Sequence, residues 1–140
     1  MAIDDRLAVG SVLFEFVTTT IPPKNKYYIV VGISGNEVAL GTVYINSEIN
    51  PNIFNTPQLR GYHIPISAEE YPFLKYDSFI DCSHIEERSV SDVLQCLNND
   101  NKRYGYYASI SAIELDTVLQ TLDNAHTIAP VVKRKFGIRK

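Results

Sequence analysis

Residues 26–47 read KYYIVVGISGNEVALGTVYINS, and this stretch decides the fold class. Two apolar runs, Tyr27 to Ile33 and Val38 to Ile45, flank Ser34-Gly35-Asn36. Gly and Asn tolerate positive φ, so this pattern predicts a β-hairpin. Both runs are apolar on two faces apart from Thr42, which predicts strands that are buried on both sides or that close a small barrel.

Polar residues lie at both open ends of this hairpin. Lys24, Asn25 and Lys26 precede the first strand, and Asn46 and Ser47 follow the second. An antiparallel hairpin brings its open ends together. The stretch therefore proposes a polar site as well as a core.

Further short strands and two helices are predicted around the hairpin. Hydrophobic alternation, turn residues and N-cap signals define them. The predicted strands are Ser11–Thr18, Gly61–Ile66 with Pro65 placing it at a sheet edge, Asp77–His84, Glu87–Val90 and Arg103–Ala108. A single helical turn is predicted from Ser67, a helix at Ser91–Asn98, and a longer helix capped by Ser111 with the stripe Ile113, Leu115, Val118, Leu119 and Leu122. We expect a mainly β (α+β) domain, a small barrel-like sheet packed by a C-terminal helix and short accessory helices.

Length and composition fit one globular domain. The chain has 140 residues, of which 45% are hydrophobic and 21% charged, close to globular averages. Nine Tyr and six Phe without Trp favour strands. No stretch reads as a signal peptide or as a membrane span. With two cysteines predicted to stay reduced, we expect a cytoplasmic protein without a membrane partner.

The net charge of −3 is unevenly distributed. Residues 133–140 carry five basic side chains and no acidic one, so residues 1–132 carry a net charge of −8. We therefore divide the chain into one domain, residues 1–132, and a basic C-terminal tail, residues 133–140. The tail can contact phosphate or an acidic face of its own protein. Because chain termini usually fray, however, we expect it to stay solvated.

Cys82, His84 and Cys96, with His63 or Asp81, include the residue types that bind metals. Their spacing matches no common zinc pattern, so a buried structural cysteine is the better reading and we predict neither a metal nor a cofactor. Cys82 near His84 also resembles a nucleophile and base in composition, but a catalytic pair is defined by geometry rather than by spacing.

A second candidate is the basic and aromatic run of residues 102–107, KRYGYY. Bases stack on tyrosine and phosphates pair with Lys and Arg, so this composition suits single-stranded nucleic acid. Tyrosine is also simply a good strand former. The predicted nucleic-acid-binding residues are Lys24, Lys102, Arg103, Tyr104 and Tyr106.

Several parts of the chain occur in a characteristic order. A strand begins after a glycine, a basic residue starts the next apolar strand, a hydroxyl residue ends the third, and later strands precede a closing helix. These parts are Gly10–Phe16 (GSVLFEF), Lys26–Gly32 (KYYIVVG), Tyr44–Ser47 (YINS), Ser78–Cys82 (SFIDC) and Gly105–Ser111 (GYYASIS). Over residues 10–125 this order resembles the MazF/PemK family of toxin ribonucleases, small SH3-like barrels from bacterial toxin–antitoxin pairs.

The resemblance implies a site at the open end of the hairpin. In that family an Arg at the start of the second strand and a Thr or Ser at the end of the third cleave RNA. By position these become Lys26 and Ser47, with Asn46 beside Ser47. Lysine lacks the planar fork of arginine, and Tyr27 stands where the family has proline.

Two functions follow as alternatives. The first is a metal-independent endoribonuclease that cleaves single-stranded RNA, forms a homodimer and is neutralised by a cognate antitoxin. The second is a catalytically degenerate barrel that binds a protein or a nucleic acid without cutting it; the acidic main body favours a protein partner. A metabolic enzyme that uses Cys82 is a third, weaker reading.

Overall fold

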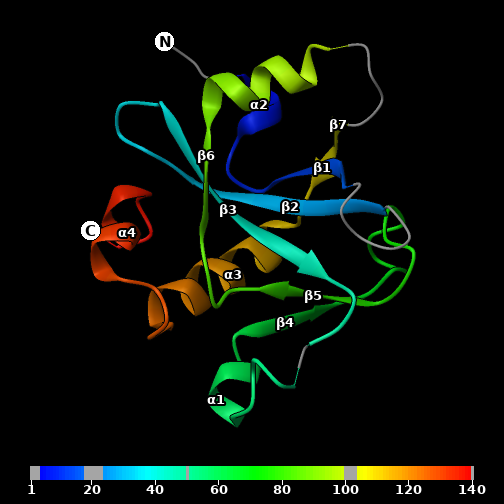
Figure 1. Ribbon diagram of the computed structural model, residues 1–140, viewed down its shortest axis with the longest axis vertical. Coiled ribbons are helices and arrows are strands. Elements are labelled where there is room, and N and C mark those ends of the chain that lie inside the picture. Colours follow the sequence, from blue (N-terminus) through cyan, green and yellow to red (C-terminus); the bar gives the residue numbers. More distant parts are fainter. Residues whose placement is uncertain (1–3, 18–23, 50, 100–103, 140) are drawn as a thin grey trace.

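The computed structural model describes residues 4–17, 24–49, 51–99 and 104–139. Short strands dominate it, and helices follow late in the chain (Figure 1). The elements are η1 (Asp5–Leu7), β1 (Ser11–Val17), β2 (Lys24–Ile33), β3 (Ala39–Asn46), α1 (Pro57–Arg60), β4 (His63–Ile66), β5 (Ser78–Asp81), β6 (Glu86–Ser89), α2 (Val90–Leu97), β7 (Tyr104–Ser109), α3 (Ala112–Asn124) and α4 (Pro130–Lys135).

The strands form one antiparallel sheet in the order β4-β5-β3-β2-β1-β7, with β6 paired to the same edge of β3 as β5. This confirms the predicted mainly β class and the edge position of the Pro65 strand. Barrel closure is not seen. Among the described strands no pairing joins β7 to β4, so the sheet is open.

The predicted hairpin is present as β2 and β3, in the register Tyr27↔Ile45. At its turn, Glu37 has φ of 58°, whereas neither Gly35 nor Asn36 takes the expected positive φ. The Ser34 hydroxyl instead donates to the Asn36 side-chain oxygen at 2.6 Å, and the Ser34 amide donates to Ala39. Side-chain bonding within the turn therefore holds it closed.

Both faces of the central strands are covered, which explains why both are apolar. Figure 1 shows α2 at one end of the sheet and α3 and α4 on the opposite side. One core cluster joins Val12, Ile29 and Val43 to Val118 and Leu122 of α3. The other joins Leu7, Leu13, Tyr28, Val30 and Leu40 to Val90 and Val93 at α2. Helices on two sides, rather than closure of the sheet, bury the hairpin.

The C-terminal segment is part of this core. Phe136 is 4% exposed and lies over Gly32 and Gly41, which pair with each other across β2 and β3. A Cβ on Gly32 would lie 2.6 Å from the Phe136 Cβ, and one on Gly41 would lie 2.8 Å from its ring. Only glycine leaves space for the phenylalanine at both positions.

The expected solvated tail is therefore absent from residues 133–139. The Lys133 ammonium is buried and donates to the carbonyl oxygens of Asp123 and Ala125, at 2.7 and 2.8 Å. Arg139 pairs with the Asp123 carboxylate, and Lys135 pairs with Glu87. Of the readings of this segment, contact with acidic groups of the same protein fits these residues.

Two local expectations are corrected, and a third is confirmed. Helix α2 begins at Val90 with Ser89 as its N-cap, two residues before the predicted cap Ser91, because β6 runs directly into it. Ile113 does not join the buried stripe of α3, since it is 84% exposed in the first turn. The capping pattern at Ser67 makes only a single turn, as predicted: the Glu70 amide donates to the serine hydroxyl.

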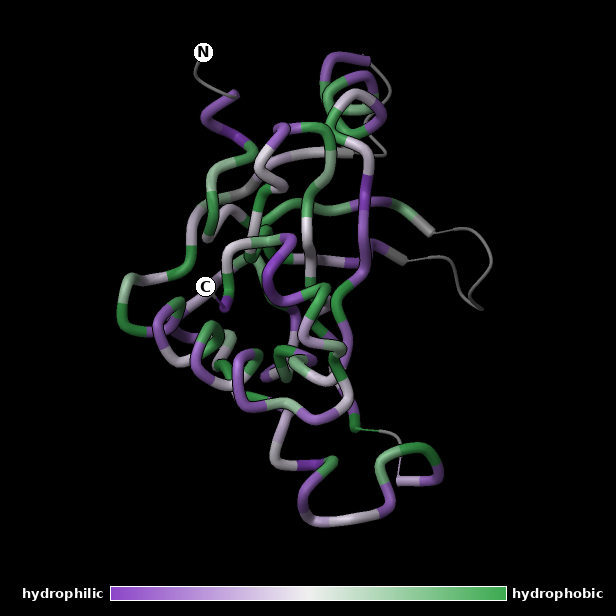
Figure 2. The backbone as a smooth tube through the Cα atoms, turned by 90° about the vertical axis from the view of Figure 1, so that its left-hand side faces the viewer, coloured by the Kyte–Doolittle hydropathy of each residue, from purple (hydrophilic) through white to green (hydrophobic). Residues whose placement is uncertain are grey.

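Hydrophobic residues are concentrated in the strands of the sheet. Figure 2 shows hydrophobic residues along the crossing strands, while the chain around α1 extends away from the rest of the molecule. The longest described helix, α3, has 13 residues. None of the helices in the described part of the chain has the length and apolar character needed to cross a membrane.

Candidate functional site

The structure brings the three predicted catalytic residues to one cavity. Lys26, Asn46 and Ser47 line a hollow of about 560 Å³ between the ends of β2 and β3 and the residues around Tyr76. The hairpin register produces this proximity, because Tyr27 pairs with Ile45 and the residues just beyond them meet at the strand ends.

The lining of this cavity combines aromatic rings, two lysines, amides and hydroxyls. This mixture suits nucleotides, since rings stack on bases and ammonium groups pair with phosphate. Among the described lining residues there is no histidine and no carboxylate. The lining is Phe16, Asn25, Lys26, Tyr27, Ile45, Asn46, Ser47, Leu74, Lys75, Tyr76 and Ser78.

The Lys26 side chain leaves β2 on the face opposite the one that carries Tyr27 and Ile45, two residues that line the cavity. Its Nζ lies 4.2 Å from the centroid of the Tyr44 ring. Because successive residues of a strand face opposite sides, Lys26 and Tyr44 share one face, while Tyr27 and Ile45 share the other. Lys26 therefore belongs to both the cavity and the opposite face.

That opposite face carries a cluster that we call the Arg88 cluster: Glu15, Tyr28, Tyr44 and Arg88. The guanidinium lies 3.9 Å from the centroid of the Tyr28 ring, donates to the Tyr44 hydroxyl at 2.9 Å, and contacts a Glu15 carboxylate oxygen at 3.4 Å. Burial raises the pKa of Tyr28 to about 12 and also raises the pKa of Tyr44. Both phenols therefore stay protonated at neutral pH.

Of the remaining predicted nucleic-acid residues, Tyr106 has a described side chain, and it does not line the cavity. Tyr106 is 41% exposed on β7 and pairs with Leu13, so β1 separates it from the hairpin. Lys24 begins β2 and Tyr104 begins β7. Lys102 and Arg103 lie outside the described residues. Lys75 and Tyr76, also a basic residue beside an aromatic one, are the ones at the cavity.

The cysteine and histidine residues form no site in the described part of the chain. Cys82 is buried in the core on the α3 side, and burial raises the pKa of its thiol, which disfavours the thiolate. Cys96 lies on α2, against the other core, and both thiols are free. His84 bonds to Glu86 at 3.1 Å. No group of three metal-binding side chains is found among the described residues.

Sequence reasoning missed Arg88, Glu15 and Lys75. A basic-aromatic dipeptide signal at Lys75-Tyr76 was present in the sequence. Arg88 carried no such signal, because its position depends on the pairing of Arg88 with Leu40 across β6 and β3. That pairing joins segments far apart in the chain.

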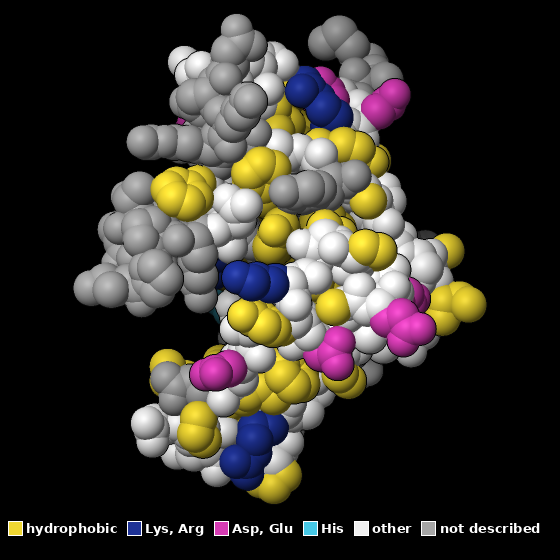
Figure 3. All heavy atoms as spheres, turned by 90° about the vertical axis from the view of Figure 1, so that its right-hand side faces the viewer, with side chains coloured by type: hydrophobic (Ala, Val, Ile, Leu, Met, Phe, Trp, Pro, Cys, Tyr) yellow, Lys and Arg dark blue, Asp and Glu magenta, His cyan; other side chains and the backbone are white. Residues whose placement is uncertain are grey.

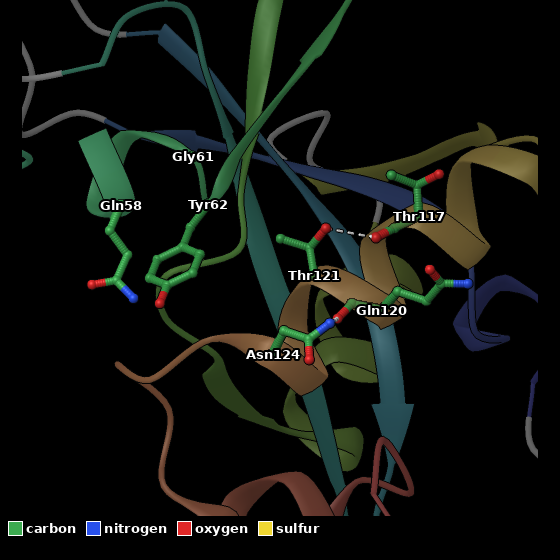
Figure 4. Close-up of a pocket in the computed structure, with 7 residues that line it drawn as sticks. All are labelled: Gln58, Gly61, Tyr62, Thr117, Gln120, Thr121 and Asn124. Atoms are coloured by element: carbon green, nitrogen blue, oxygen red, sulfur yellow. Dashed lines mark hydrogen bonds between the residues drawn. The ribbon is translucent and has the colours of Figure 1, made fainter. Parts of the chain in front are cut away.

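A second hollow of about 350 Å³ lies between α1 and α3 (Figure 4). Its side chains are uncharged amides, hydroxyls and a tyrosine. Four of them donate hydrogen bonds within α3. Thr121 donates to the Thr117 carbonyl at 2.8 Å and Asn124 to the Gln120 carbonyl at 3.0 Å, while Thr117 and Gln120 donate to Ile113 and Asp116. It offers no acid, base or cation, so the hairpin-end cavity is the stronger candidate.

The face at the hairpin's open end is mixed rather than uniformly basic. Figure 3 views the molecule from the side on which β2 begins and β3 ends, and shows basic side chains separated by hydrophobic and acidic ones. Such a surface favours local contacts to a phosphate over a long electrostatic track.

No protein-family model matches this chain, and no curated protein matches it. The site must therefore be judged on its own residues.

Proposed function

We propose that this protein binds single-stranded RNA at the hairpin-end cavity and cleaves it without a metal ion, as a toxin ribonuclease of MazF/PemK type. One observation carries the proposal: Lys26, Asn46 and Ser47, assigned by the resemblance, line a single cavity.

The proposed chemistry is attack of a ribose 2′-hydroxyl on the adjacent phosphorus. The 5′-oxygen leaves, and the products are a 2′,3′-cyclic phosphate and a 5′-hydroxyl, so the reaction consumes no water and needs no metal. Lys26 and Lys75 would balance charge that develops on the phosphate. The hydroxyl of Ser47 and the amide of Asn46 would orient the 2′-hydroxyl.

The cavity walls support RNA over duplex DNA. Phe16, Tyr27 and Tyr76 offer rings on which unpaired bases stack, and stacking requires bases that are splayed out of a helix. A cavity of about 560 Å³ is within the range that holds a small ligand such as a nucleotide.

Binding without cleavage is the second candidate function. The described cavity lining holds neither a carboxylate nor an imidazole, the usual proton acceptors in such reactions, and the Lys26 ammonium rests on Tyr44. The protein would then hold RNA, or a protein partner that its acidic body favours, without cutting. The first function, the toxin ribonuclease, also includes a cognate antitoxin protein, a homodimer and a cytoplasmic setting.

The test is incubation of the protein with a long single-stranded RNA in EDTA. We expect cleavage with cyclic-phosphate ends that is lost in Lys26→Ala and in Ser47→Ala. RNA that binds but stays intact would favour the second function. Binding whose affinity does not weaken with salt would argue against a phosphate contact.

A further inference from the structure

Three charged or polar residues lie side by side across the end of the sheet, on the face opposite Tyr27 and Ile45. They are Glu15, Lys26 and Asn46. Glu15 pairs with Lys26 across β1 and β2. Continuing the register Tyr27↔Ile45 by one residue places Asn46 on the other side of Lys26. Directly paired residues of neighbouring strands share a face. A carboxylate, an ammonium and an amide therefore stand side by side on three strands.

Arg88 reaches the same row from β6. Its Nη2 contacts Glu15 and donates to the Tyr44 hydroxyl, and its Nε bonds to Thr42 Oγ1 at 3.3 Å. No hydrogen-bond partner for Nη1 is found in the described part of the chain. A guanidinium that its neighbours hold in one orientation is a preorganised anion contact.

Both ends of the Glu15–Arg88 pair are accessible. The side chains are 27% and 16% exposed, so a substrate can reach them while the surrounding protein limits screening by water. The row also supplies what the cavity lacks, because Glu15 is a carboxylate that can accept a proton.

We propose that Glu15 is the general base and Arg88 the phosphate-binding cation of the RNA cleavage proposed above, on which this inference rests. The nucleobase occupies the aromatic cavity, and the sugar-phosphate backbone crosses the strand ends at Lys26 and Asn46. The scissile phosphate then lies on the Arg88 face. Lys26, which belongs to both sides, joins the two halves of the site.

The reaction balances with these groups alone. The Glu15 carboxylate takes the proton of the 2′-hydroxyl, O2′ forms a bond to phosphorus, and the bond from phosphorus to O5′ breaks. The Lys26 ammonium gives a proton to the leaving O5′. Arg88 Nη1 bonds to a non-bridging phosphate oxygen. Proton exchange with water returns Glu15 to the carboxylate and Lys26 to the ammonium.

The test separates binding from chemistry in Glu15→Gln, with Glu69→Gln as a matched control because Glu69 is exposed and outside both halves of the site. Cleavage of a long single-stranded RNA in EDTA gives kcat and KM. An oligonucleotide with a single 2′-deoxy position at the cleaved step cannot react, so it reports binding alone.

We expect Glu15→Gln to lower kcat by about 100-fold or more, the range for losing a general base, with binding of the 2′-deoxy probe within about threefold of wild type. Arg88→Lys should weaken both, since lysine cannot reproduce the fixed guanidinium. Glu69→Gln should match wild type. If thermal melting shows Glu15→Gln to be unfolded, Glu15→Asp, which keeps the charge but shortens the reach, must show the fall in kcat.

The outcomes distinguish the two proposals. Wild-type protein that does not cleave RNA overturns both the proposed function and this assignment. Wild-type protein that cleaves, together with a folded Glu15→Gln or Glu15→Asp variant at wild-type kcat, overturns the assignment of Glu15 alone. Loss of probe binding in Glu15→Gln to the same extent as kcat makes Glu15 a structural residue and also overturns the assignment.

Discussion

The two ends of the β2–β3 hairpin are built from the same two strands and do different things. Towards the turn, Gly32 and Gly41 face each other and Phe136 fills the space above them. At the open end, Asn46 and Ser47 line a cavity, and no side-chain hydrogen bond to either is found within the described residues. One end is filled by the protein itself, and the other leaves polar groups for a ligand.

The turn end of the hairpin therefore serves stability, and the open end is available for function. Close packing at the turn end makes any change of volume costly. Polar groups without protein partners contribute little to folding, so changes at the open end should alter ligand chemistry instead. Variants at the two ends test this separation directly.

The largest effect is expected for Phe136→Ala. Removing this 4% exposed ring opens a void above Gly32 and Gly41, and such truncations cost about 3–5 kcal/mol. Chemical denaturation measures the loss. Val131→Ala in α4, the helix that Phe136 directly follows, is the control, since Val131 is 64% exposed and should change the free energy of unfolding by less than about 0.5 kcal/mol. Equal losses in the two variants would contradict the packing at this end.

Gly32→Ala should destabilise the protein by about 1–3 kcal/mol, because its Cβ would meet both the backbone and the Cβ of Phe136. Gly35→Ala in the turn is its match, since a Cβ there meets nothing within 4 Å. Thermal melting compares them. A Gly32→Ala variant as stable as Gly35→Ala would show that α4 does not dock where it is described.

Lys133→Ala is expected to cost about 1–3 kcal/mol, because it removes two charge-assisted hydrogen bonds, one of them buried. The Asp123 carbonyl keeps its bond from Arg139, and the Ala125 carbonyl keeps a longer bond from the Ile128 amide. Lys135→Ala should cost less than about 1 kcal/mol, since its pair with Glu87 is half exposed. Urea denaturation of both variants checks the order. If Lys135→Ala destabilised the protein more than Lys133→Ala, residues 133–139 would instead behave as the solvated tail that the sequence predicts.

The smallest stability changes are expected at the open end. Ser47→Ala should shift the free energy of unfolding by less than about 0.5 kcal/mol. Lys26→Ala should lose at most about 1 kcal/mol, the value of its contact with the Tyr44 ring. The same denaturation assay applies, and a loss of several kcal/mol in either variant would mean that these side chains serve folding.

The hairpin and the edge strand β4 were predictable because their signals are local. Apolar runs around a turn and a proline that cannot donate in a sheet centre are properties of neighbouring residues. The burial of Phe136 was not predictable, because it depends on packing against two glycines about a hundred residues earlier in the chain. Basic composition alone favoured a solvated tail, and long-range packing reversed that expectation.

The candidate site also combines residues that local sequence predicts with residues that only long-range pairing brings together. Lys26, Asn46 and Ser47 were found from the hairpin and from a family resemblance, since a register brings strand ends together. Arg88 could not be found, because only the pairing of β6 with β3 brings it to Tyr44. The direction of the Lys26 ammonium, away from the cavity floor, also required the strand pleat to be known.

The most direct test of the central claim combines both assays on the double variant Lys26→Ala, Ser47→Ala. We expect a melting temperature within a few degrees of wild type and a loss of at least about 100-fold in cleavage of single-stranded RNA in EDTA, because charge stabilisation is removed. A folded double variant that cleaves RNA at the wild-type rate would contradict the assignment of the hairpin's open end as the functional site.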